Sequence, residues 1–192
     1  MTLGLYNGGL LVGLSDPIPD PPVDPIMGHV AEVLRSAGLA MAGLKIAARP
    51  VQVTVEPGKS GRDLAQLTRL VRMCLVEAGL DERQIKIVTS GHSLDILPAW
   101  SGKLRVVDQL RARLRDPRLE ILRIGDRGDL GGNDFELLAS AMGLSVDRVS
   151  PSAEGCWNPL PAGVSGAAGT LRLLSALRVG EGDLRLDLEV LR

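Results

Sequence analysis

The sequence predicts an α/β protein in two parts, and two different rhythms along the chain support this division. Between residues 25 and 97, a helix followed by two short strands occurs twice. Between residues 102 and 149, helices and strands alternate singly, which is typical of a parallel sheet with crossover helices. With 192 residues, 45% of them hydrophobic, the chain is long enough to bury a sizeable core.

Residues 1–20 predict a core strand, a turn and a linker. The start, MTLGLYNGGLLVGL, is apolar, but Asn7-Gly8-Gly9 interrupts it and no basic residue precedes it, so it resembles a strand and turn more than a signal peptide. The prolines of SDPIPDPPVDP fix φ and remove backbone donors, which favours a rigid loop. No stretch approaches the ~20 consecutive apolar residues that span a membrane.

The pattern of residues 21–96 predicts an α/β domain. Its first helix has Asp24 as N-cap, Pro25 at the first helical position and Gly38 at its end. The second helix is expected to begin at Ser60, whose hydroxyl caps the first turn while the Asp63 side chain bonds back to the cap residue. The four strands are expected at LKIAA, VQVTVE, IKIVTS and SLDILP, which are residues 44–48, 51–56, 85–90 and 93–98.

Over residues 97–178 the sequence predicts alternating helices and strands, and residues 179–192 are expected to form a tail. In order, we expect a helix from Gly102, a strand LEILRIGD (119–126), an acidic loop, a helix from Asn133, a strand LSVDRV (144–149) and a helix near 170–178. The tail, DLRLDLEVL, alternates leucine and valine with charged residues, so it predicts an edge strand. Uptake of this strand by a partner's sheet is the alternative interpretation.

The segment RIGDRGDLGGNDFELL, residues 123–138, concentrates carboxylates and glycines after an apolar strand. In parallel sheets ligands bind beyond the carboxyl ends of strands, and Asp126 falls at such an end with Asp129 and Asp134 close behind. Magnesium prefers oxygen ligands of this kind, and the glycines relax the backbone around the acids. The sequence therefore predicts a magnesium site in this loop.

Lys103 lies at the head of the helix that precedes this strand. The helix dipole slightly disfavours a cation at that end, so we expect Lys103 to have a function there. Pairing with anionic oxygens of a phosphoryl group is such a function.

Three segments carry a resemblance to the haloacid dehalogenase-like (HAD) phosphohydrolases, in the branch with a large α/β cap that includes sucrose-phosphate phosphatase-like and Cof-like enzymes. LDILPAWSGKLRVVDQL is similar to the lysine motif of that family, ILRIGDRGDLGGNDFELLASAMGL to its acidic motif, and LYNGG to the Asn-Gly strand before the cap. The resemblance spans about residues 3 to 178. It implies a HAD-like Rossmannoid core, present as its C-terminal half (97–178), with an α/β cap of two helix-strand-strand units (21–96).

The resemblance also implies a magnesium-dependent phosphohydrolase that acts on a small phosphorylated metabolite, a sugar or polyol phosphate, through an aspartyl-phosphate. Lys103 would be catalytic and would bind the phosphoryl oxygens, and Asp126 would hold the metal. Asn133 is a further candidate for phosphate or substrate binding. The cap residues that are candidates for recognising a sugar hydroxyl are Arg49, Glu56 and His92.

The sequence departs from the family pattern in two places. The second acid of the family follows the first by about four residues, whereas Asp129 follows Asp126 by three and Asp134 by eight, so both remain candidates for completing the metal site. The family also begins with an Asp-x-Asp strand that carries the nucleophile, and nothing here fits it. We therefore expect an N-terminal half, from upstream sequence or a separate chain, to supply the nucleophile. We expect this chain alone to be inactive and to self-associate through an exposed sheet edge.

Composition narrows the remaining function classes. A net charge of −1 and 2% aromatic residues give no basic excess or stacking platform, so nucleic acid is not the predicted partner. Cys74 and Cys156 lie far apart without a disulfide framework, which suits a reducing compartment and predicts a cytoplasmic protein. The alternative to a phosphatase is a non-catalytic binding or regulatory module, or a truncated fragment, that keeps the fold.

Overall fold

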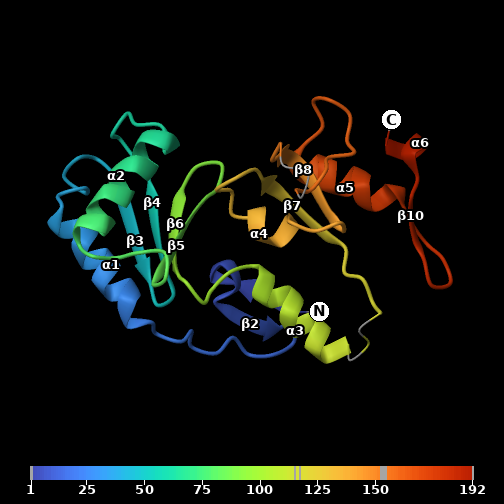
Figure 1. Cartoon of the computed structure of the whole chain (residues 1–192), viewed down its shortest axis with the longest axis horizontal. Helices are drawn as coiled ribbons and strands as arrows, with labels where there is room; N and C mark the ends of the chain where they lie inside the picture. The colour runs from blue at the N-terminus through green and yellow to red at the C-terminus, as the bar shows by residue number, and fades with distance from the viewer. Residues whose placement is uncertain (1, 115, 117, 152–154, 192) are drawn as a thin grey trace. The chain divides into compact units, whose positions relative to one another are not determined.

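The computed structural model describes residues 2–114, 116, 118–151 and 155–191 (Figure 1). The chain divides into two compact units, Met1–Arg113 and Leu114–Arg192. This division groups the helix that follows residue 102 with the N-terminal unit. The predicted cap boundaries at residues 21 and 96 remain predictions.

The first unit contains a β-hairpin, three helices and a four-stranded sheet. Helix-strand-strand occurs twice between residues 25 and 98, as the sequence predicts. The elements are β1 (Thr2–Leu5), η1 (Tyr6–Gly8), β2 (Leu10–Gly13), α1 (Pro25–Ser36), β3 (Lys45–Arg49), β4 (Gln52–Glu56), α2 (Leu64–Glu77), β5 (Ile85–Thr89), β6 (Leu94–Pro98) and α3 (Leu104–Leu114).

The four-stranded sheet has the order β3-β4-β6-β5, and all of its neighbouring strands are antiparallel. β4 and β6 pair at the centre, so the two helix-strand-strand units share one sheet. Helices α1 and α2 lie along one face of this sheet (Figure 1) and bury its apolar side chains. This core includes Val53, Val55, Leu94 and Ile96. Because side chains alternate along a strand, the residues between these point to the other face.

The caps of α1 follow the sequence prediction. The Asp24 carboxylate accepts a hydrogen bond from the backbone N–H of Ile26 at 3.0 Å, and Pro25 begins the helix. Gly38 follows the helix with φ +70°, a conformation that glycine adopts without strain.

Helix α2 begins later than predicted. Its N-cap is Asp63, whose carboxylate accepts from the Gln66 N–H at 2.7 Å while the Gln66 side chain accepts from the Asp63 N–H at 3.2 Å. The predicted start at Ser60 is wrong because the Ser60 hydroxyl donates to the Pro57 carbonyl at 2.6 Å, inside the preceding turn. The capping box is therefore Asp63 with Gln66.

The second unit is built on a parallel strand pair. Its elements are β7 (Arg123–Gly128), α4 (Phe135–Leu138), β8 (Gly143–Val149), α5 (Gly166–Ala176), β9 (Leu177–Val179), β10 (Leu184–Leu186) and α6 (Leu188–Leu191). β7 and β8 are parallel, as the alternation predicts. A small core joins β8, α5 and α6 through Leu144, Val146, Leu173, Ala176 and Leu191.

Three elements of the second unit differ from their predicted limits. β7 begins at Arg123 rather than at Leu119, because its pairing with β8 begins at Arg123 opposite Gly143. The helix expected from Asn133 is a single turn, α4, that begins at Phe135. Helix α5 begins at Gly166, earlier than the predicted 170.

The predicted edge strand in the tail is wrong beyond its first residues. β10 pairs antiparallel with β9 in a separate two-stranded sheet, and the next residues form the one-turn helix α6. The Asp187 carboxylate accepts from the Glu189 N–H at 3.2 Å, which caps this turn. The turn buries Leu191 in the second core, and the alternating pattern does not encode this contact.

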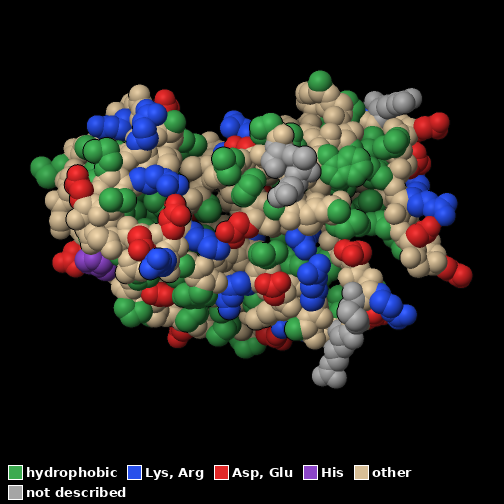
Figure 2. Space-filling view, viewed as in Figure 1, with side chains coloured by type: hydrophobic (Ala, Val, Ile, Leu, Met, Phe, Trp, Pro, Cys, Tyr) green, Lys and Arg blue, Asp and Glu red, His purple; other side chains and the backbone are tan. Residues whose placement is uncertain are grey.

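None of the helices in the described ranges combines the length and the apolarity that crossing a membrane requires. On the face shown in Figure 2, basic and acidic side chains are interspersed.

Candidate functional site

The acidic loop begins inside β7. The register of β7 against β8 shifts between Gly125 and Arg127, and Asp126 lies at this irregularity with its side chain exposed. A bulge of this kind redirects a side chain and ends regular pairing. Asp126 therefore sits near the carboxyl end of the strand, as predicted, although within the strand rather than after it.

Asp134 holds the loop closed. Its residue is 3% exposed, and its Oδ2 accepts hydrogen bonds from the backbone N–H of Asp126 at 3.0 Å and of Arg127 at 3.3 Å. Gly125 makes this approach possible, because a Cβ there would lie 2.7 Å from the Asp134 carboxylate. One glycine of the motif is thus required by close packing against an acid.

Asp129 is paired with Arg127. The guanidinium Nε donates to Asp129 Oδ1 at 2.7 Å and Nη2 donates to Oδ2 at 3.0 Å, so both carboxylate oxygens are engaged. The side chains of Arg127 and Asp129 are 9% and 25% exposed, respectively. The hydrogen bond from Arg127 holds the pKa of Asp129 below its ordinary range, and the hydrogen bond to Asp129 raises the pKa of Arg127.

Asn133 precedes Asp134 in the same loop. Its side-chain oxygen is enclosed and has no hydrogen-bond partner among the described residues. Among the described residues, no three His, Cys, Asp or Glu side chains cluster in a way that suits a metal ion. The loop does combine one exposed carboxylate, Asp126, with an orphaned acceptor, Asn133. Magnesium binding by this loop stays a prediction.

Lys103 lies immediately before α3 and is half-buried. Its carbonyl accepts from the Val106 N–H at 3.1 Å, and the Gly102 carbonyl accepts from the Arg105 N–H at 3.1 Å, so Lys103 is part of the first helical turn. Lys103 belongs to the first unit and Asp126 to the second. Their convergence stays a prediction.

The three cap candidates are surface residues of the first unit. Arg49 ends β3 and His92 lies in the turn between β5 and β6, and both are exposed. Glu56 ends β4 and pairs with Lys45 at 3.4 Å. Among the described contacts, no hydrogen bond joins any two of these three side chains.

Sequence reasoning missed a polar cluster on the face of the four-stranded sheet opposite α1 and α2. It comprises Asn7, Gln52, Thr54 and Asp95, joined by side-chain hydrogen bonds. Asp95 and Gln52 are each 6% exposed. The available signal was an acid inside the otherwise apolar strand LDILP, since a buried carboxylate requires polar partners.

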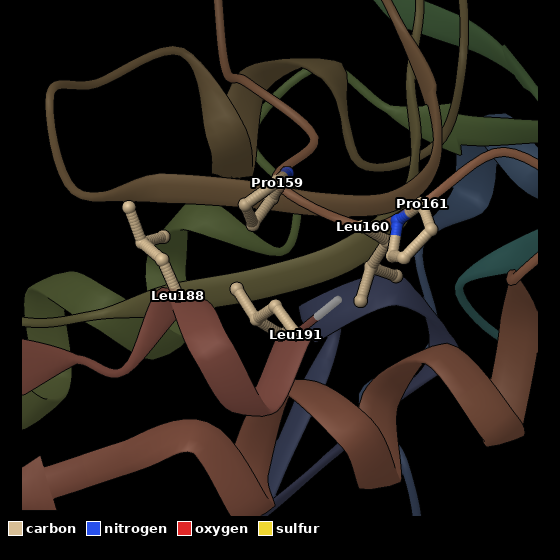
Figure 3. A pocket seen from close by; sticks show the side chains of 5 residues that line it. All are labelled: Pro159, Leu160, Pro161, Leu188 and Leu191. Atoms are coloured by element: carbon tan, nitrogen blue, oxygen red, sulfur yellow. The ribbon is translucent and has the colours of Figure 1, made fainter.

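The second unit also contains a pocket of about 340 Å³ (Figure 3). It is lined by Pro159, Leu160, Pro161, Leu188 and Leu191. These side chains are apolar, so the pocket offers no side-chain group for phosphoryl chemistry.

These elements form an α/β fold of the HAD-like type, which combines a Rossmann-like core with a cap. The solved structure of the sucrose-phosphatase from Synechocystis sp., in complex with sucrose and phosphate, carries this assignment. The two chains are 18% identical with a TM-score of 0.53, and the match covers 88% of this chain and 70% of the sucrose-phosphatase.

Two further solved structures are phosphatases at lower similarity. Trehalose-6-phosphate phosphatase from Aspergillus fumigatus is 17% identical with a TM-score of 0.47, and the match covers 82% of this chain and 63% of that one. Truncated IMP-nucleotidase from Plasmodium falciparum is 14% identical with a TM-score of 0.43, over 66% of this chain and 36% of that one. Both are too distant to show a shared fold on their own. Comparison of the sequence with protein-family models and with curated proteins gives no match.

Proposed function

We propose that this chain is part of a HAD-type phosphohydrolase that acts on a small phosphorylated metabolite, a sugar or polyol phosphate. The observation that carries the proposal is the acidic loop, in which Asp126 lies at the irregularity near the end of the parallel strand β7 and the Asn133-Asp134 pair comes just before the helical turn α4. The likeness to the sucrose-phosphatase fold supports it.

In this proposal Asp126 holds a magnesium ion, and Asp134 rather than Asp129 is the acid that completes the arrangement. Both oxygens of Asp129 are engaged by Arg127. Asp134 instead binds the two backbone N–H groups on either side of the Asp126 side chain, and so sets its direction. When bound, magnesium neutralises charge on the phosphoryl oxygens.

Lys103 has a complementary role. Its ammonium group donates to the phosphoryl oxygens and stabilises their charge as the bond to the leaving alcohol breaks. Asn133 orients the substrate phosphate. Arg49 and His92 on the cap are the candidates for contact with the sugar portion.

The nucleophile comes from another segment, because no Asp-x-Asp sequence occurs in the 192 residues. The strand pairing of the second unit leaves an edge at which a strand that carries the nucleophile can pair. Across the described part of the chain, β7 pairs with β8 alone in a two-stranded parallel sheet. Small parallel sheets need further strands and covering layers, so the outer edge of β7 suits a strand from the missing half. Self-association through this edge is the expected behaviour of the chain alone.

The test is hydrolysis of p-nitrophenyl phosphate with magnesium, by the full chain alone and mixed with a polypeptide that carries an Asp-x-Asp strand of a HAD-type phosphatase. We expect no turnover from the chain alone and turnover from the mixture. Asp126→Asn should abolish this turnover. Asp183→Asn, which changes an acid in the β9–β10 hairpin, is the matched control and should leave it unchanged.

Magnesium binding gives a readout that does not depend on turnover. In ¹H–¹⁵N spectra of the chain alone, added magnesium should shift the amide signals of residues 125–134, and Asp126→Asn should remove these shifts. Turnover by the chain alone that survives Asp126→Asn would refute both the need for a partner and the metal assignment.

A non-catalytic module is the second candidate, and one contact favours it. Arg127 already neutralises Asp129 inside the loop, so the loop has an internal cation without a metal. Under this alternative the mixture shows no turnover and magnesium leaves the amide signals of the loop in place.

A further inference from the structure

The face of the four-stranded sheet opposite α1 and α2 carries a set of hydrogen bonds centred on Asp95. Thr54 of β4 lies directly opposite Asp95 of β6 and donates to its Oδ1 at 2.8 Å. Gln52 Nε2 donates to the same oxygen at 3.0 Å. The other oxygen, Oδ2, accepts from the Asn7 side chain at 3.3 Å. A group that only accepts hydrogen bonds is thus surrounded by three donors.

Asn7 belongs to a strained turn. Tyr6 and Asn7 have φ values of +52° and +51°, in the left-handed region that side chains other than glycine rarely adopt. Such a conformation persists where surrounding contacts hold it in place. Here the contacts are the bonds from the Asn7 amide to Asp95 and, at 3.2 Å, to the Gln52 oxygen.

The same turn touches the start of α3. The Gly8 carbonyl accepts a hydrogen bond from Arg105 Nη1 at 3.0 Å. Gly8 also packs directly against the Gly102 carbonyl, because a Cβ at Gly8 would overlap that atom. The guanidinium carbon Cζ of Arg105 lies 4.7 Å from the centre of the Trp100 ring. The residues on both sides of Lys103 are therefore in contact with the strained turn.

We propose that Asp95 is a positioning residue, which acts through the Asn7 side chain and the Gly8 carbonyl to fix the first turn of α3 and thereby Lys103. This inference rests on the proposed role of Lys103. The proposal requires a carboxylate, with one acceptor oxygen for Thr54 and one for Asn7. Asp95→Asn keeps the oxygen that accepts from Thr54 but places an NH₂ group opposite the NH₂ group of Asn7, so the second hydrogen bond is lost. Loss of that bond would release the turn from the sheet without removing a core side chain.

Amide hydrogen exchange of the full chain tests the structural part. Asp95→Asn should speed exchange in residues 2–9 and 99–106 by about three- to tenfold, the range expected from one lost hydrogen bond, and leave residues 64–77 of α2 unchanged. A general loss of stability would instead speed exchange in α2 as well. Asp63→Asn, the same chemical change at the N-cap of α2, is the control and should leave residues 99–106 unchanged.

A second variant checks that Asp95 acts through Asn7. Asn7→Gly removes the amide but keeps a residue that adopts positive φ readily. It should reproduce the effect of Asp95→Asn, and the double variant should show no more than either single change, because both break the same contact. Additive effects, or unchanged exchange at residues 99–106 in Asp95→Asn, would overturn the proposal.

Turnover by the mixture with the Asp-x-Asp segment tests the link to Lys103. Asp95→Asn should lower kcat with little change in KM, because Lys103 acts on charge that develops in the transition state. Unchanged kcat together with faster exchange at residues 99–106 would refute the link. If the unmodified mixture has no activity, the proposed function fails, while the exchange experiment still decides whether Asp95 positions α3.

Discussion

The Arg127–Asp129 pair should contribute more to the stability of the second unit than any surface ion pair. Asp129→Asn removes the charge opposite a guanidinium whose side chain is 9% exposed. Breaking a buried pair from one side typically costs about 3–5 kcal/mol. Because a quarter of the Asp129 side chain is exposed and water can partly replace it, we expect a loss of about 2–4 kcal/mol.

Acid should remove the same contribution. The folded-state pKa of Asp129 lies below its ordinary value of 3.8, chiefly because Arg127 donates hydrogen bonds to it. The stabilisation is therefore complete above pH 3.8 and declines as the pH falls through the lower, folded-state pKa. The difference between the natural chain and Asp129→Asn should shrink over the same interval.

Urea unfolding measures both effects. The fluorescence of Trp157 reports the second unit when Trp100, in the first unit, is replaced by Phe. Asp183→Asn is the control, because Asp183 and Arg185 form an exposed pair worth about 0–1 kcal/mol. The double change Arg127→Met with Asp129→Leu should recover most of the loss, since it leaves no buried charge unpaired. A loss below about 0.5 kcal/mol for Asp129→Asn at pH 7 would refute the reasoning.

Two further stability effects follow from packing. Leu34→Ala empties a fully buried position between α1 and the sheet and should cost about 2–5 kcal/mol in urea unfolding, whereas Met41→Ala, at a 94% exposed position, should cost little. Gly125→Ala forces a methyl group against the Asp134 carboxylate and should lower the thermal midpoint by an amount that corresponds to about 1–3 kcal/mol. Gly91→Ala, with open space around it, is the control, and equal effects at both glycines would contradict the close approach.

Periodicity predicted the elements of the two helix-strand-strand units well, because α1, α2 and the strands of the sheet bury one face in one core. Leu34 of α1, Val71 of α2 and Leu94 of β6 are fully buried, each on the face of its own element that packs into this core. The limits that failed depend on contacts that periodicity does not encode. The start of α2 is set by a reciprocal bond between Asp63 and Gln66, which competes with an equally plausible cap at Ser60.

The acidic loop shows why roles within a motif are harder to predict than the motif. The sequence places three acids together but does not distinguish them. The structure engages Asp129 with the neighbouring Arg127 and turns Asp134 inward to two backbone N–H groups. Asp126 remains exposed. This division depends on the bulge in β7, which has no sequence signature beyond the flanking glycines.

The internal contacts of this loop bear on how a partner would complete the site. Asp134 accepts from two backbone N–H groups and Arg127 pairs with Asp129, so these groups have partners within the chain and a partner strand need not supply them. In the proposed function, the edge of β7 would contribute backbone pairing, which is independent of side-chain identity, and Asp126 would contribute the charge that selects a metal-bound phosphate. Strand pairing and charge thus act on different atoms of the same short segment. Under this proposal, mutation can remove recognition of the partner that carries the nucleophile and recognition of the substrate separately.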